Sequence, residues 1–147
     1  MKVLVIGGGA REHTLVWKIA QSPKVEELYV APGNAGTGAI ARNLNVSPTD
    51  IEALAGAAQQ YKIDLTLVGP EAPLASGIVD LFESHDLPIF GSSQKATQLE
   101  SSKVFAKQLM QKYGIPTARG AIFSSFSYVI HNRYDYIVYT QKGNRYS

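Results

Sequence analysis

The sequence has no cysteine, one tryptophan and no apolar run near the roughly 20 residues that span a bilayer. Disulfides and thiolate metal sites are therefore excluded, and a reducing cytoplasm is compatible with this composition. The N-terminus leads directly into an apolar strand pattern without a small-residue cleavage site, so no signal peptide is expected. We expect a cytoplasmic protein that contacts no membrane.

The sequence also lacks a large excess of charge of either sign. The formal net charge is +2, and the basic residues are scattered along the chain, which does not indicate nucleic-acid binding. His13, His85 and His131 lack metal-ligand spacing, and no pair of carboxylates or nucleophile with a base stands out. The length of 147 residues fits one typical domain. We therefore predict no catalytic residue and no metal ligand.

The chain does have a continuous apolar run, Val3–Ile6, followed at once by Gly7-Gly8-Gly9. Such a run is typical of a strand buried on both faces of a parallel sheet. The glycines allow a sharp turn and a close approach to a ligand, and the N–H groups of the following helix suit a phosphate. This segment predicts an α/β protein that handles a phosphorylated small molecule.

Strand and helix patterns alternate beyond this point. Helices are expected at 11–21, 51–61, 77–85 and 100–113, and strands at 3–6, 25–30, 64–68 and 88–90. In the first helix, the expected buried side consists of Leu15, Trp17, Ile19 and Ala20. The alternation predicts right-handed βαβ crossovers and an open parallel sheet with flanking helices, a Rossmann-like α/β fold.

Three loops follow strands of this predicted sheet: Gly7–Gly9, Pro32–Thr37 and Gly69–Leu74. Ligands of open parallel sheets bind at the carboxyl ends of the strands. We therefore expect the three loops to converge on one edge and form a cradle for a sugar phosphate.

A dinucleotide-binding module is the main alternative that the glycines raise. Gly7 and Gly9 fit the G-x-G-x-x-G fingerprint, but Glu12 stands at the third glycine position. The strand that ends at Tyr29–Pro32 also lacks the carboxylate that grips a ribose hydroxyl. Nicotinamide binding is therefore disfavoured, while a binding-only nucleotide module stays open.

Ordinary structural roles also stay open for several residues. Glu12 could favour the helix dipole, and His13 could be a normal surface or core residue. Lys103 could be an exposed helix lysine, and the glycine-rich turn could lack any ligand role. Arg11 is harder to dismiss, because guanidinium pairs with phosphate bidentately.

Several motifs together resemble the phosphoribosylamine–glycine ligase family, also called glycinamide ribonucleotide synthetase. They are Gly7–His13, Pro32–Thr37, Val68–Leu74, Phe90-Gly91, Leu99–Lys103 and Gly114–Ala118, in that order. The resemblance implies an ATP-dependent ligase of de novo purine biosynthesis. It would activate glycine with ATP as an acyl phosphate, which the amine of 5-phosphoribosylamine attacks, assisted by magnesium or manganese.

The resemblance also implies domains and site residues. Residues 1–100 would be a pre-ATP-grasp N-terminal domain, and 101–123 the start of the ATP-grasp region. Gly9 and Arg11 would hold the substrate phosphate, Asn34 would shape the surrounding loop, Glu71 would contact the ribose, and Lys103 would contact ATP phosphates. The full substrate-binding set is Gly7, Gly9, Arg11, Glu12, His13, Pro32, Gly33, Asn34, Gly36, Thr37, Pro70 and Glu71.

Residues 124–147 depart from the family pattern, which continues into a long ATP-grasp domain. A truncated gene, a frameshifted end or an incomplete sequence would each give such an atypical tail. We expect a fragment that lacks most of the ATP site, the glycine site and the metal ligands, and that is inactive alone. A fragment that does not fold stably is a further alternative.

Overall fold

A five-stranded, all-parallel sheet in the order β3-β2-β1-β4-β5 forms the centre of residues 1–97. The structure is a computed structural model that describes residues 1–118, 120–123 and 137–140. The strands of this sheet are β1 (Lys2–Gly7), β2 (Glu27–Pro32), β3 (Arg42–Asn43), β4 (Leu65–Val68) and β5 (Ile89–Phe90). The helices of this part are α1 (Ala10–Ile19), α2 (Ala35–Gly38), α3 (Ile51–Tyr61), α4 (Glu71–Ala75) and α5 (Ile78–Ser84), and α6 (Gln94–Ser101) begins in it and ends beyond residue 97. The predicted Rossmann-like α/β class is confirmed.

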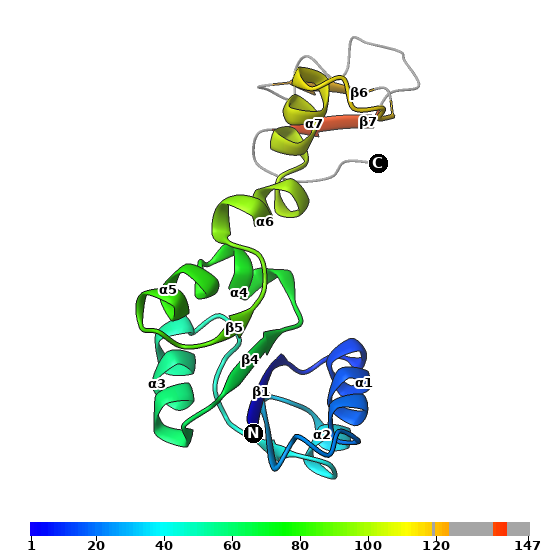
Figure 1. Cartoon of the computed structure of the whole chain (residues 1–147). Coiled ribbons are helices and arrows are strands. Elements are labelled where there is room, and N and C mark those ends of the chain that lie inside the picture. The colour runs from blue at the N-terminus through cyan, green and yellow to red at the C-terminus, as the bar shows by residue number, and fades with distance from the viewer. Residues whose placement is uncertain (119, 124–136, 141–147) are drawn as a thin grey trace. The chain divides into compact units, whose positions relative to one another are not determined.

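Strand β1 lies in the middle of the sheet, and its side chains build both hydrophobic cores. Leu4 and Ile6 face the core shared with α3 and α5, while Val3 and Val5 face the core shared with α1. Figure 1 accordingly shows α1 on one side of the sheet and α3 and α5 on the other. A central strand covered on both faces explains the unbroken apolar run in the sequence.

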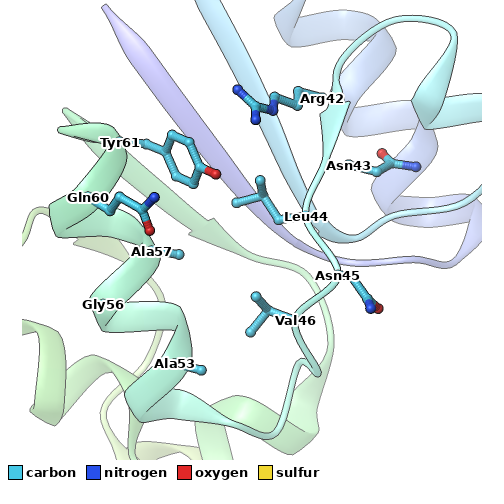
Figure 2. A pocket seen from close by; sticks show the side chains of 10 residues that line it. All are labelled: Arg42, Asn43, Leu44, Asn45, Val46, Ala53, Gly56, Ala57, Gln60 and Tyr61. Atoms are coloured by element: carbon cyan, nitrogen blue, oxygen red, sulfur yellow. The ribbon is translucent and has the colours of Figure 1, made fainter.

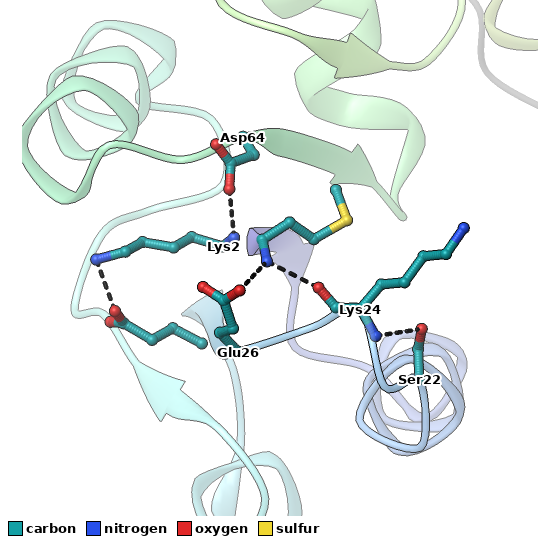
Figure 3. A network of polar contacts seen from close by, with 7 residues as sticks. Lys2, Ser22, Lys24, Glu26 and Asp64 are labelled. Carbon is teal, nitrogen blue, oxygen red and sulfur yellow. Dashed lines mark hydrogen bonds and ion pairs between the residues drawn. The ribbon is translucent and has the colours of Figure 1, made fainter.

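The start of β1 is anchored at the edge of the sheet where the parallel strands begin (Figure 3). The Met1 ammonium donates to the Lys24 carbonyl over 2.7 Å and pairs with Glu26 at 3.2 Å. The Lys2 N–H donates to Asp64 Oδ2 over 2.6 Å, which joins β1 to the residue before β4. These contacts hold the strand starts together, opposite the edge where the predicted site residues lie.

Helix α1 buries a different face from the expected one. Leu15 and Trp17 are exposed by 43% and 56%, and Ala20 is exposed as well. The helix instead turns Glu12, Val16 and the half-buried Ile19 inward, positions that recur at the helical spacing of four and three residues. The expectation for Leu15, Trp17 and Ala20 was wrong, because the buried face begins with a carboxylate that a hydrophobicity pattern does not detect.

Two further expectations differ from the structure. The helix expected at 100–113 is two helices, α6 and α7 (Lys103–Lys112), separated at Ser102, whose hydroxyl accepts the Phe105 N–H over 3.3 Å as an N-cap. The short elements α2, α4 and β3 were not expected at all. Each has five residues or fewer, too short for a periodic pattern.

Residues 98–147 form a second unit. It contains α7 and a pair of parallel strands, β6 (Gly120–Phe123) and β7 (Ile137–Thr140). The structure pairs 137–140 with the earlier β6. Most of the predicted atypical tail, 124–136 and 141–147, lies outside the described residues.

Candidate functional site

Two glycine-containing loops meet where β1 and β2 end. The Gly33 N–H donates to the Gly7 carbonyl over 3.2 Å, and Asn34 Nδ2 donates to the Gly8 carbonyl over 2.9 Å. A Cβ atom on Gly8 would lie 2.6 Å from the Gly33 carbonyl oxygen, so the backbones approach too closely for a side chain. The predicted convergence of these two loops is confirmed.

The third loop joins them through its own contacts. The Gly69 N–H donates to the Ile6 carbonyl over 3.0 Å at the end of β1, and Glu71 begins α4 directly afterwards. Glu71 Oε1 lies 3.5 Å from the Arg11 guanidinium, which comes from the first turn of α1. All three predicted loops therefore lie at one edge of the sheet. We call this cluster, residues 7–13, 32–37 and 69–71, the strand-end site.

The loop after β2 is held by its own polar side chains. Asn34 caps α2 by accepting the Thr37 N–H over 3.0 Å, and the Thr37 hydroxyl accepts the Asn34 N–H over 2.7 Å. Asn43 of β3 completes the arrangement, since its Nδ2 donates to the Asn34 carbonyl over 2.8 Å. Thr37 is fully buried within this network. Thr37 therefore stabilises this loop from inside.

Asn43 is a residue that the sequence reasoning missed. Its side chain links the edge strand β3 to the loop that carries Asn34 and Thr37. The only signal available was an asparagine shortly after the Pro32–Thr37 motif, and no strand pattern marked its neighbourhood.

Arg11 and Glu71 carry the exposed charges of the strand-end site. Their side chains are 73% and 44% exposed, so their ion pair is screened by water and contributes little to stability. Either side chain can therefore exchange its partner for a ligand at small energetic cost. A guanidinium can bind a phosphate, and a carboxylate can accept hydrogen bonds from sugar hydroxyls.

Glu12 and His13 lie deeper in the same site. Glu12 is 4% exposed, and its Oε2 accepts the Gly9 N–H over 2.7 Å. The half-buried His13 ring lies beside Gly36, where an added Cβ would come within 3.0 Å of the ring. The structure thus brings every predicted substrate-binding residue to the strand-end site, some as exposed groups and others as packing and capping groups.

Lys103 belongs to the second unit. It is exposed and is the first residue of α7, directly after the Ser102 cap. Among the described residues, no group of three or more His, Asp or Glu side chains could hold a metal ion. None of the helices described has the length and apolar character to cross a membrane.

A separate cavity of about 550 Å³ lies between β3 with its following loop and α3 (Figure 2). Arg42 stacks over the Tyr61 ring at 5.2 Å at one end, and Gly56 leaves the α3 wall open. Figure 2 shows the Asn43 side chain directed away from this cavity. None of the predicted site residues lines it.

Comparisons with known proteins agree with the motifs. The family model "Phosphoribosylglycinamide synthetase, N domain" matches residues 1–100. A phosphoribosylamine–glycine ligase of Caldanaerobacter subterraneus subsp. tengcongensis is 56% identical over 126 residues, which cover 86% of this chain and 30% of that protein. The chain spans about 30% of the length of the curated relatives it matches.

Solved structures agree with the fold. The crystal structure of phosphoribosylamine–glycine ligase from Thermotoga maritima matches 81% of this chain and 26% of that one, with 28% identity and a TM-score of 0.58. The biotin carboxylase domain of the Hydrogenobacter thermophilus 2-oxoglutarate carboxylase, solved with MgADP, ADP and bicarbonate, matches 82% of this chain and 29% of its own. Its TM-score is 0.64 at 18% identity, a likeness of fold alone. With its first 100 residues matched by the family model and its strand-end loops in one cluster, the chain belongs to the phosphoribosylglycinamide synthetase family, in its N-terminal domain.

Proposed function

We propose that this chain supplies the phosphoribosylamine-binding part of an ATP-dependent ligase that joins glycine to 5-phosphoribosylamine in purine biosynthesis. The observation that carries the proposal is the meeting of the three loops, with an exposed cation and an exposed carboxylate 3.5 Å apart. A sugar phosphate presents an anion and several hydroxyls. Arg11 and Glu71 offer one suitable partner for each.

In this proposal the Arg11 guanidinium binds the phosphate and Glu71 accepts hydrogen bonds from ribose hydroxyls. Asn34 holds the loop after β2 against Gly8 and so fixes the wall of the site. Gly7, Gly9, Glu12, His13, Pro32, Gly33, Gly36, Thr37 and Pro70 complete the proposed set through backbone shape and packing.

The division of the chain is part of the proposal. Residues 1–100 act as the pre-ATP-grasp domain, 101–123 begin the ATP-grasp region, and 124–147 form an atypical tail. The proposed role of Lys103 is to contact nucleotide phosphates, and its exposed position at a helix start suits an anion. ATP with Mg²⁺ or Mn²⁺ would supply the activation of glycine in the complete enzyme, and a cytoplasmic location stays a prediction.

Binding without turnover is the behaviour we expect of the 147-residue chain itself, because it spans about 30% of its relatives' length. Negligible ADP formation with glycine and phosphoribosylamine would agree with this expectation. Robust turnover by the purified chain would contradict it.

The direct test is a titration with ribose 5-phosphate, followed by the amide shifts of the strand-end site, with ribose as the unphosphorylated comparison. Arg11→Ala should weaken ribose 5-phosphate binding by about 1.5–3 kcal/mol, the contribution of a charged hydrogen bond, and leave ribose binding unchanged. Glu71→Gln should weaken both ligands.

Arg42→Ala is the matched control, because Arg42 lines the cavity at β3 and lies outside the strand-end site. Equal affinity of the wild type for ribose and ribose 5-phosphate would contradict the phosphate assignment. A loss confined to Arg42→Ala would place the ligand in the cavity between β3 and α3 instead.

A further inference from the structure

The glycines of the strand-end site divide into two kinds. Gly7 and Gly33 adopt φ angles of +125° and +74°, a backbone region that favours glycine. Gly9 has a φ of −84°, and Gly69 is not among the positive-φ glycines. The backbone therefore does not require glycine at positions 9 and 69, and another constraint must act there.

That constraint is the Glu12 side chain. A Cβ atom on Gly69 would lie less than 3.0 Å from Glu12 Cγ, Cδ and Oε1, and one on Gly9 would lie 2.9 Å from Glu12 Oε2. A Cβ on Gly7 would meet Glu12 Cγ at 2.5 Å. The Glu12 side chain therefore occupies the space that the three glycines leave free at the ends of β1 and β4.

The polar contacts of Glu12 point the same way. Oε2 accepts the Gly9 N–H over 2.7 Å, while Oε1 is buried without a hydrogen-bond partner among the described residues. Burying a carboxylate oxygen without a hydrogen-bond partner costs free energy of folding, so the position of Glu12 needs an explanation in the site. With only 4% of its surface exposed, the side chain is placed to set the loops rather than to cover a ligand.

We propose that Glu12 is a positioning residue, which sets the separation between the Gly7–Gly9 loop and the Gly69–Glu71 loop. Arg11 follows the Gly7–Gly9 loop, and Glu71 ends the other loop. By setting the distance between the two loops, Glu12 therefore also sets the distance between the two side chains that are proposed to bind the ligand. The consequence for ligand binding rests on the function proposed above, whereas the packing of Glu12 against the glycines does not.

The packing is tested by a double-mutant cycle of Gly69→Ala and Glu12→Ala in the 147-residue chain. Gly69→Ala alone should lower Tm by about 5 °C, because the new methyl group collides with Glu12. In the Glu12→Ala background the same change should shift Tm by about 1 °C or less. Gly56→Ala is the matched control, since an added Cβ there meets nothing within 4 Å, so its effect on Tm should be the same in both backgrounds.

Equal Tm losses from Gly69→Ala in both backgrounds would overturn the proposal. If Glu12→Ala does not fold, Glu12→Ser replaces it, because serine also lacks the Cδ and Oε1 atoms that an added Cβ on Gly69 would meet, and Gly69→Ala should then cost less Tm than in the wild type. Glu12→Gln is a further control in the same cycle. The glutamine keeps the length and an acceptor for the Gly9 N–H, so Gly69→Ala should remain as harmful beside it as beside Glu12.

Ribose 5-phosphate binding separates positioning from direct contact. Glu12→Gln should bind within about threefold of the wild type, while Gly69→Ala, which displaces the loop, should bind about tenfold more weakly. A tenfold loss in Glu12→Gln would show that the carboxylate itself meets the ligand and would overturn the positioning role. A wild type that does not bind ribose 5-phosphate would refute the proposed function. The Tm cycle would then still test whether Glu12 packs against Gly69.

Discussion

Glu27 is the centre of a small charged cluster at the start of β2. The Lys2 ammonium lies 2.6 Å from Glu27 Oε1, and the Tyr29 hydroxyl donates to Oε2. The hydrogen bond from Lys2, followed by that from Tyr29, holds the pKa of the Glu27 carboxyl below its ordinary value. The hydrogen bond that each of these groups makes with Glu27 raises its own pKa, that of the Lys2 ammonium and that of the Tyr29 hydroxyl.

A pH dependence follows from the lowered pKa of Glu27. Its contribution to stability is complete above the ordinary value of 4.5 and is lost as the pH falls through the lower folded-state pKa. Glu27→Gln should therefore reduce the loss of Tm between pH 7 and pH 3. Glu83→Gln, an exposed glutamate of α5, serves as the control and should leave the acid-side loss unchanged. An identical pH profile for Glu27→Gln and wild type would contradict the role of the cluster.

At the scale of single residues, the sequence could predict which side chains gather at the strand-end site but not how each one serves it. Arg11 and Glu71 lie at a helix start and a strand end, where open parallel sheets place ligands. The burial of Glu12 depends on Gly69, which is 57 positions away in the chain, and a motif does not report such a contact.

Among the elements, α3 matches its predicted range from Ile51 to Tyr61, and its first turn carries a local signal. Asp50 caps the first turn, and Lys62 closes the helix in the left-handed conformation with a φ of 53°. Strand β3 carried no such signal. Its residues Arg42 and Asn43 are exposed, and only the hydrogen bonds to β2 make them a strand.

The cap of α3 gives a prediction at this scale. Asp50 Oδ1 accepts the Ala53 N–H over 3.1 Å, so Asp50→Ala should lower the free energy of unfolding by about 0.5–2 kcal/mol in urea denaturation. Asp50→Asn retains an acceptor and should stay close to the wild type. Glu83→Ala, which removes an exposed glutamate of α5, controls for the loss of a charge. Equal losses in Asp50→Ala and Asp50→Asn would assign the effect to charge rather than to the cap.

For the whole molecule, the location of the two hydrophobic cores decides which part of the chain can fold independently. Every member of both hydrophobic cores lies within residues 1–97, including Phe82 on one side of the sheet and Val16 on the other. The strand-end site uses residues of the same unit only. The boundary expected at residue 100 rested on motif order and stays a prediction, and the last strand of the sheet, β5, ends at Phe90.

A chain of residues 1–100 should therefore unfold cooperatively, with a Tm close to that of the first transition of the 147-residue protein. It should also bind ribose 5-phosphate with the same affinity, because Arg11, Asn34 and Glu71 are all retained. A chain that ends at residue 86 is the matched control. It lacks β5, whose Ile89 packs against the core of α3 and α5, and it exposes β4 as an edge strand. Calorimetry should show a lower Tm for the shorter chain, and loss of the cooperative transition already in residues 1–100 would mean that the second unit is needed to fold the first.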